Sequence, residues 1–387
     1  MEKTYPIDVL GIKKMGVERW LEGYYLPVKG EEYQNISTNI LDAYLFTLKQ
    51  FNNEILYWLV VSNIKIVTDV SLYSLSILML TRLQNKGFKY IASRDKREIN
   101  KLLLNKDPLE LINFNKLIKD KLTSLTYMES TKNILRLIKR NLSAFGFGNW
   151  NFIKNISEPF FLVGDRYIPE VYRFCTEKDI YPISLPIMLF SGNRIDNSLT
   201  PNEAVLVSQF IQRFVNSIKK IIPVIGEPAF EYLQNSLYKR FEYSMLFLKQ
   251  NIYSLRKMRK TKSKTLLMPM LGDQQNRIFS AAWRITGGEV IGFAHGNNIC
   301  HNYSQPIIFE AVSIANTYVT ESSSQKRIYK HFMLKYSHKY KDDLKVAEII
   351  SLKKTNYKPP IFAKLQKDRS VNKINKVMVV GFPKGFF

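Results

Sequence analysis

The residues best suited to chemistry lie in 287–301, GGEVIGFAHGNNICH. A short apolar run leads directly into His295 and Gly296. A neutral imidazole can act as a general base near neutral pH, and its protonated form can bind phosphate. Gly296 lets a ligand or another backbone approach closely, and Asn297 follows with a hydrogen-bonding side chain. We interpret His295 as a candidate catalytic residue and Gly296 and Asn297 as substrate contacts; a capped turn with a solvated histidine is the alternative.

Other polar residues also follow apolar runs that we expect to be strands. Ligands of open parallel sheets bind outside the carboxyl ends of the strands, so these residues are predicted to share one site. Asp69 is the second catalytic candidate, as a base or a sugar contact, and a turn aspartate is the alternative. The polar groups at strand ends are Asp69, Asp165, Asp273, His295 with Gly296, and Thr320-Glu321-Ser322.

The sequence GDQQNR follows one predicted strand and opens a helix. Asp273, Asn276 and Arg277 could hydrogen-bond the hydroxyl groups of an acceptor, so we take them as candidate substrate contacts. Aspartate is also a favoured N-cap, and Asp273 could simply bond the free N–H groups of the helix. Both interpretations stay open at this point.

A serine-rich turn follows the run TYVT and opens another helix. Free N–H groups at a helix N-terminus favour an anion, so a phosphate could bind here. Thr320, Glu321, Ser322 and Ser324 are therefore candidate substrate contacts. Serine is equally common as a helix cap, which is the alternative.

Short β-branched runs alternate with helical patterns along the chain. This alternation predicts an α/β fold, a Rossmann-like parallel sheet with helices on both faces. The helix that follows the first strand is expected to stop at Gly87, which can take a positive φ. The predicted strands are 64–68, 88–92, 160–163, 180–185, 265–271, 290–294 and 317–320, and the predicted helices are 72–83, 167–176, 276–285, 309–315 and one after 320.

The remaining segments suggest a domain plan. Residues 1–365 are expected to form one Rossmann-like domain with helical insertions at about 100–142 and 201–260 that cover the sheet. Residues 366–375 resemble a linker. Residues 376–387 read as a strand and a glycine-containing loop, which is how a second nucleotide-binding unit would begin. We therefore expect this second domain to be truncated, with an added strand of the one sheet as the alternative.

The chain has 387 residues and a formal net charge of +24. Such a charge attracts nucleic acid, anionic lipid headgroups or phosphorylated substrates, although a composition rich in Lys, Asn, Ile and Tyr is also typical of AT-rich genomes. Two cysteines are too few for a disulfide framework and indicate a reducing, cytoplasmic setting. We predict no signal peptide, because the first residues lack a continuous apolar region and a small-residue cleavage site. We also predict no membrane-spanning helix, because Asn63, Lys65 and Asp69 interrupt the most apolar stretches.

Several site classes lack their sequence signatures. There is no Walker A loop, G-x-S-x-G elbow or H-E-x-x-H helix, and no RNP-type or zinc-finger pattern. The histidines and cysteines lack the spacing of a structural zinc site. No Asp-x-Asp pair occurs, so we expect no obligatory metal. Nucleic-acid binding is then supported by charge alone, through residues 254–265 and 326–345.

The order of strand, GDQQNR turn, helix, EVIGFAHGNN, short helix and TYVTESSSQKRIY resembles the N-terminal half of GT-B glycosyltransferases of bacterial surface-polysaccharide assembly. It is also similar to the glycerophosphotransferases of teichoic acid synthesis. The resemblance covers about residues 265–332. It implies an N-terminal domain that holds the acceptor, a C-terminal Rossmann domain that holds a nucleotide-activated donor, and a site in the cleft between them.

In that scheme His295 faces the cleft as a base or a phosphate contact. Gly381 and Lys384, in the last turn of the sequence, would begin the donor site. The implied partners are a nucleotide sugar and a glycan or lipid-linked acceptor, with no cofactor and with peripheral contact to an anionic membrane at the inner face of the plasma membrane. A basic nucleic-acid-binding protein and a non-catalytic sugar-binding scaffold are the alternative functions.

Overall fold

The structure is a computed structural model. Every statement about it refers to the residues that it describes: 4–6, 28–91, 160–163, 169–180, 182–185, 198–223, 226–258, 265–269, 271–294, 305–340, 345 and 347–352.

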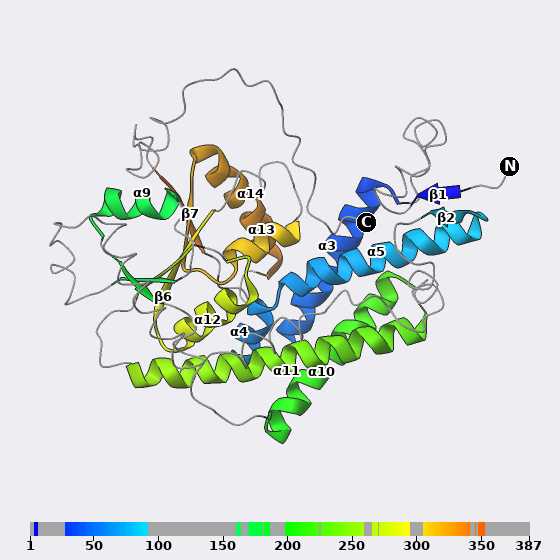
Figure 1. Ribbon diagram of the computed structural model, residues 1–387, viewed down its shortest axis with the longest axis horizontal. Helices are drawn as coiled ribbons and strands as arrows, with labels where there is room; N and C mark the ends of the chain where they lie inside the picture. Colours follow the sequence, from blue (N-terminus) through cyan, green and yellow to red (C-terminus); the bar gives the residue numbers. More distant parts are fainter. Residues whose placement is uncertain are drawn as a thin grey trace, which may run out of the picture.

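A six-stranded, fully parallel sheet forms one half of the protein (Figure 1). Its order is β4-β3-β5-β6-β7-β8, and Leu267 pairs with Ile291, which in turn pairs with Thr317. The chain begins the sheet with β3 and places β4 on one side of it. All later strands are added on the other side of β3, so the direction of winding reverses between β3 and β5. The strands are β3 (Phe161–Val163), β4 (Ile183–Leu185), β5 (Thr265–Met268), β6 (Glu289–Phe293), β7 (Thr317–Thr320) and β8 (Glu348–Ser351).

Helices cover both faces of this sheet. Helix α9 (Pro169–Lys178) buries Val171, Phe174 and Cys175 against one face. The other face carries α12 (Gln274–Ile285) over β5 and β6, and α14 (Ser323–Tyr340) over β7 and β8, with α13 (Gln305–Val312) beside α14. Side chains of one strand alternate between the faces, as in a sheet buried on both sides: Leu266 packs in the α12 core and Leu267 in the α9 core.

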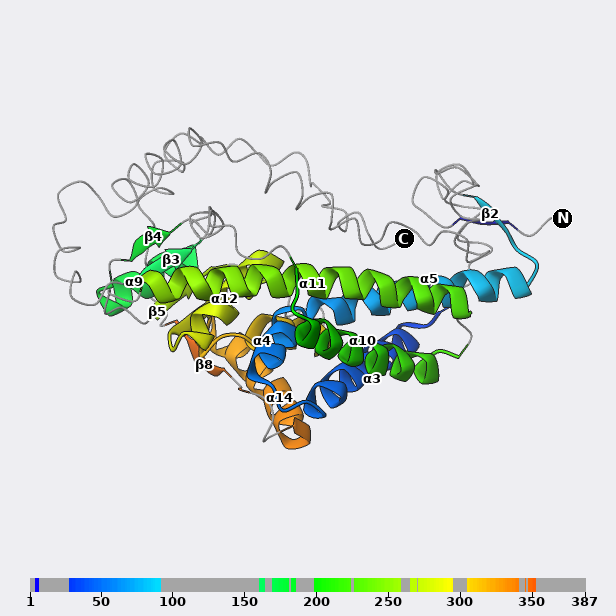
Figure 2. The same cartoon turned by 90° about the horizontal axis from the view of Figure 1, so that it is seen from below.

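Five further helices form a layer outside α12 and α13. They are α3 (Gly30–Lys49), α4 (Glu54–Ser62), α5 (Lys65–Asn85), α10 (Pro201–Ile221) and α11 (Glu227–Met258). Helix α11 has 32 residues, about 48 Å at 1.5 Å per residue, and runs beside α12 at one end and α10 at the other (Figures 1 and 2).

The interior of the helical layer is aromatic. The rings of Phe210 and Phe214 lie 5.5 Å and 5.0 Å from that of Tyr44, both edge-on. Burying a side chain such as Phe210 completely contributes roughly 1.5–3 kcal/mol. This interior is continuous with the α12 side of the sheet, so the two layers share one core.

The second and third predicted strand–helix–strand segments are confirmed, with bounds that differ by a few residues. The helix predicted after residue 320 is α14, and the short helix predicted at 309–315 begins earlier, as α13. Gly87 has a φ of 72°, as expected of a glycine that follows a helix. The fold is thus α/β with a parallel sheet and helices on both faces.

The first predicted segment is right in part: its helix at 72–83 forms within α5 (Lys65–Asn85), but its first strand is wrong. Residues 64–68, expected as a strand, begin helix α5, and Asp69 lies within that helix. The β-branched run favours a strand locally, but Ile66, Val67 and Val70 share a helical face that is fully buried, and this packing decides the structure. The predicted strand at 88–92 does form, as β2 (Lys89–Ile91), yet it pairs with β1 (Thr4–Pro6) in a separate two-stranded sheet.

The helices predicted within 201–260 are present as α10 and α11. Their expected role is wrong, because α11 packs on α12 and α4 rather than covering the sheet itself. The predicted insertion at 100–142, the linker at 366–375 and the second unit at 376–387 lie outside the described residues.

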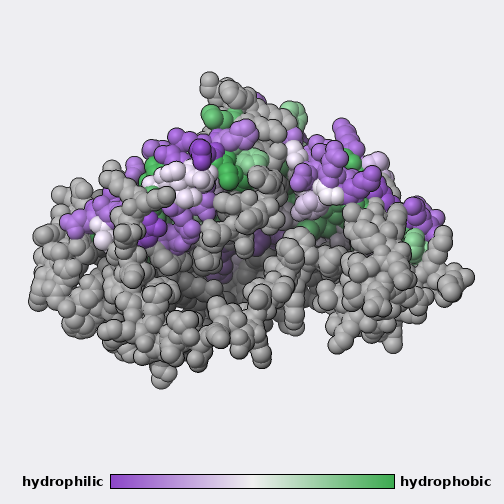
Figure 3. Space-filling model, turned by 90° about the horizontal axis from the view of Figure 1, so that it is seen from above, coloured by the Kyte–Doolittle hydropathy of each residue, from purple (hydrophilic) through white to green (hydrophobic). Residues whose placement is uncertain are grey.

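Among the described residues, one helix is long and apolar enough to cross a membrane. It is the stretch Lys65–Leu83 of α5, and 53% of it is buried inside the protein. Such burial is also found in the core helices of soluble proteins. On the face seen in Figure 3, the coloured surface is mostly hydrophilic with small hydrophobic areas.

Candidate active site

The carboxyl ends of the six parallel strands lie along one edge of the sheet. Helix α9 follows β3 and helix α12 follows β5, so their N-termini flank the point where the winding reverses. The two connections leave in opposite directions there, and in such sheets ligands bind at this point. Two groups of ionisable side chains lie at this edge.

The first group is a buried ionic network of Asp69, Arg240, Gln274, Asn63 and Ser244. Nη1 of Arg240 donates to Oδ2 of Asp69 at 2.6 Å, and Nη2 donates to Oε1 of Gln274 at 3.3 Å. Gln274 Nε2 then donates to Oδ1 of Asn63 at 2.6 Å, which also accepts from Ser244 Oγ at 3.1 Å. The network joins α5 and α11 to the first residue of α12 and to the end of α4.

Glu310 of α13 adds a carboxyl group near this network. Burial raises its pKa above the ordinary value, and the positive charges of Arg277 and Lys65 partly offset this effect. Asp69 raises the pKa further, whereas Arg240 lowers it. Glu310 therefore remains protonated to a higher pH than an exposed glutamate.

The second group is the carboxyl pair, Glu170 and Glu321. Glu170 lies in the first turn of α9, and Glu321 directly follows the last residue of β7. Burial raises the pKa of Glu170 to about 7, and a hydrogen bond with Glu321 and the charge of that residue contribute. Two adjacent carboxyl groups cannot both ionise easily, so the pair holds a proton near neutral pH. Such a group can accept or release a proton during a reaction.

Arg277, predicted to contact the substrate, instead has a structural role. Its side chain is completely buried, and all five N–H groups donate hydrogen bonds. Nε donates to the carbonyl of Ser62 at 3.0 Å and Nη2 to that of Val61 at 2.6 Å. The remaining acceptors are the Leu271 and Glu310 carbonyls and Ser313 Oγ.

This arrangement places Arg277 between the last turns of two helices, α4 and α13. Helix C-termini carry partial negative charge and unpaired carbonyls, so they stabilise a buried cation. Burial nevertheless lowers the pKa of Arg277 to about 10, partly offset by Glu310 and Tyr44.

The other residues of GDQQNR form a helix start. Asp273 is the N-cap of α12, and its Oδ1 accepts hydrogen bonds from the backbone N–H groups of Gln275 and Asn276 at 2.9 and 3.3 Å. The capping interpretation of Asp273 is therefore confirmed. The side chain of Asn276 is partly exposed at the same turn, so it keeps access to a ligand.

The serine-rich turn also serves the fold. Thr320 is fully buried and its hydroxyl donates to the Ile350 carbonyl at 2.9 Å, which ties β7 to β8. Ser322 Oγ accepts from the backbone N–H of Gln325 at 3.2 Å, as a helix cap does. Ser324 is exposed and accepts from Arg327 at 3.5 Å. Of these candidates, only Glu321 belongs to the carboxyl pair.

Asp69, the predicted base, does lie near the sheet, but it is the ion-pair partner of Arg240. The sequence analysis did not identify Glu170, Arg240 or Glu310 as site residues. Glu170 carried a signal, since it opens the helix after a predicted strand; Arg240, 171 residues from Asp69, carried none.

Six other predicted site residues lie outside the described part of the chain: Asp165, His295, Gly296, Asn297, Gly381 and Lys384. Within the described part, no three His, Cys, Asp or Glu side chains come together in a way that could hold a metal ion. No protein-family model matches the chain, and neither a curated protein nor a solved structure matches it.

Proposed function

We propose that the protein is a glycosyltransferase-like enzyme. It transfers a sugar, or a polyol phosphate, from a nucleotide-activated donor to a hydroxyl group of a cell-envelope polysaccharide or a lipid-linked acceptor. The observation that carries the proposal is the carboxyl pair at the carboxyl edge of the sheet. An acceptor hydroxyl must lose its proton as its oxygen bonds to the donor and the nucleotide leaves, and a carboxyl group that titrates near pH 7 is suited to take that proton.

The topology gives further support. In a parallel sheet whose winding reverses, ligands bind at the reversal, and Glu170 opens the helix that follows one of its two strands. This would be the acceptor side of a Rossmann-like, GT-B-type enzyme. In this proposal His295 and Gly296, which follow β6 in the sequence, contact the substrate, and Gly381 and Lys384 contribute to the donor site.

The charge fits the proposed setting. With a net charge of +24, the protein is attracted to anionic lipid headgroups, and each Lys or Arg near such a surface contributes about 1 kcal/mol. A cytoplasmic enzyme at the inner face of the plasma membrane would meet a lipid-linked acceptor there. The donor is a nucleotide sugar or a related activated polyol, and no cofactor is proposed.

The test replaces each carboxyl group with its amide. Release of nucleotide from a panel of UDP-, GDP-, CMP- and CDP-activated donors is measured with isolated lipid-linked glycans as acceptors. Glu170→Gln and Glu321→Gln should each lower kcat by about 10²–10⁴-fold, the usual contribution of a positioned base. Glu177→Gln, at the other end of the same helix, is the matched control and should retain wild-type turnover.

The pH profile supplies a second readout. Because the base form of Glu170 exists above its pKa of about 7, kcat/KM should rise with pH up to about 7 and then level off. Transfer that is unchanged in both amide variants, or a wild-type protein inactive with every donor, would reject the proposal.

A further inference from the structure

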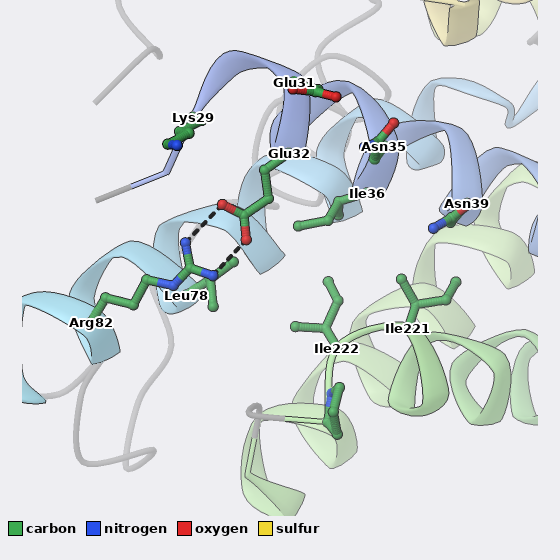
Figure 4. Close-up of a pocket in the computed structure, with 11 residues that line it drawn as sticks. Lys29, Glu31, Glu32, Asn35, Ile36, Asn39, Leu78, Arg82, Ile221 and Ile222 are labelled. Atoms are coloured by element: carbon green, nitrogen blue, oxygen red, sulfur yellow. Dashed lines mark hydrogen bonds and ion pairs between the residues drawn. The ribbon is translucent and has the colours of Figure 1, made fainter. Parts of the chain in front are cut away.

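A hollow lies at the end of the helical layer remote from the sheet. It has a volume of about 410 Å³ and is formed by the start of α3, the end of α5 and the end of α10 (Figure 4). Binding sites for small ligands typically have about 300–1,000 Å³, so the hollow can hold a ligand of one or two rings. Arg82 of this hollow and Asp69 of the ionic network lie thirteen residues apart on α5, about 20 Å along the helix.

The two walls of the hollow differ in chemistry. Helix α3 supplies a polar wall, because Glu32, Asn35 and Asn39 follow one another at helical spacing along its length. The amide groups of both asparagines are exposed and have no hydrogen-bond partner among the described residues. Their donors and acceptors are therefore available to a ligand.

The opposite wall is aliphatic. Ile221 and Ile222 at the end of α10 face Ile36 of α3 across the middle of the hollow, and Leu78 of α5 lies beside Arg82 (Figure 4). Ile36 and Ile221 are partly exposed, whereas Ile222 and Leu78 are buried, and none of these four side chains is aromatic.

The charges in the hollow balance. Lys29 and Arg82 oppose Glu31 and Glu32, and Arg82 donates to both oxygens of Glu32, at 2.7 and 2.5 Å. Arg82 also lowers the pKa of Glu32, so that carboxylate stays ionised near neutral pH. An anionic ligand would be attracted by the two basic side chains and repelled by the two carboxylates, and a cationic ligand the reverse. The hollow therefore favours a neutral ligand.

We propose that this hollow binds neutral sugar units of a polymeric acceptor, at a distance from the site of transfer. A sugar ring has hydroxyl groups along its edge and C–H groups on its face, which match the polar and aliphatic walls. The inference rests on the proposed function and deepens it, since it gives the acceptor a second point of attachment. Holding a distant part of the chain raises the effective concentration of its end at the transfer site.

The first experiment measures binding alone. Wild-type protein and the double variant Asn35→Leu/Asn39→Leu are applied to an array of neutral and acidic oligosaccharides. Loss of the amide hydrogen bonds should weaken binding of neutral oligosaccharides by about tenfold or more. Asn216→Leu, an exposed asparagine of α10 that does not line the hollow, is the matched control and should bind like the wild type.

The second experiment separates this inference from the proposed function. In the transfer assay, Asn35→Leu/Asn39→Leu should raise KM for long acceptors by about tenfold and leave kcat and the use of short acceptors unchanged. Glu170→Gln should lose transfer and keep oligosaccharide binding. The inference is overturned if the wild type binds no neutral oligosaccharide, binds only acidic ones, or binds as well after both asparagines are replaced.

Discussion

Helix α5 carries two arginine–carboxylate pairs, one near each end, and they differ in their surroundings. Near the sheet, Asp69 pairs with Arg240 of α11, whose side chain is only 3% exposed. At the remote end, Arg82 pairs with Glu32 of α3, and both side chains are about one-third exposed, at 38% and 32%. The N···O distances are nearly the same, 2.6 and 2.5 Å.

The difference shows that burial, rather than the N···O distance, sets what each pair can do. Arg240 is out of water and bound to Gln274 as well as Asp69, so removing Asp69 would leave a buried positive charge uncompensated. The Glu32–Arg82 pair stays in contact with water, where ion pairs contribute little and exchange partners readily. The Asp69–Arg240 pair therefore holds α5 and α11 together, whereas the Glu32–Arg82 pair lies at the hollow in contact with water.

Arg277 is the extreme case, a buried cation whose five hydrogen bonds go to carbonyl groups and one hydroxyl. Arg277→Met should leave these acceptors unpaired and lower the free energy of unfolding by about 3–5 kcal/mol. Urea denaturation followed by circular dichroism measures the change. Arg213→Met, which removes an exposed bond to Gln50, is the control and should cost about 0.5 kcal/mol or less. Equal losses in the two variants would contradict this assignment.

The Asp69–Arg240 pair should have the next largest effect. Arg240→Met is expected to lower the free energy of unfolding by about 3 kcal/mol, because Asp69 and Gln274 lose their shared donor. A double-mutant cycle with Asp69→Asn should give a coupling energy above about 1 kcal/mol. A coupling energy near zero would show that the pair does not act as a unit.

The smallest effect is expected for the exposed pair. Arg82→Met should cost about 0.2–1 kcal/mol, and the loss should shrink at high salt. Arg82 makes the pKa of Glu32 lower in the folded protein than in the unfolded chain. The pair therefore stabilises the fold fully at a pH above the pKa of the unfolded chain, and this stabilisation is lost as the pH falls through the pKa of the folded protein. Denaturation of Arg82→Met and wild type at pH 7 and at pH 3 measures this dependence. A larger loss of unfolding free energy at pH 3 than at pH 7 would contradict it.

The sequence predicted the parts of the fold that have local signals. Hydrophobic spacing and capping chemistry act over a few residues, so they predicted the strand at 265–268, the helix cap Asp273 and the helix that follows it. The prediction of a strand at 64–68 was wrong because its β-branched residues favour a strand, whereas packing against helices distant in the sequence makes the segment helical. The contacts of Arg240 with Asp69 and Gln274 join residues 171 and 34 positions away, and no periodic pattern encodes such pairs.

The candidate site was only partly predictable for the same reason. Parallel strands bring their carboxyl ends to one edge, so Glu321 was found from topology alone. Its partner Glu170 becomes notable through desolvation and the nearness of a second carboxyl group, and both depend on the assembled fold.

The hydrogen bonds of Arg277 also bear on how the chain is made. Its partners at the end of α4 precede it by 215 and 216 residues, and α4 itself, EILYWLVVS, is largely apolar. A ribosome adding about 5–20 residues per second takes about 10–40 s to cover that interval. For this period the carbonyl groups at the end of α4 lack the arginine that pairs with them in the folded protein, so the helix cannot reach its final packing during translation.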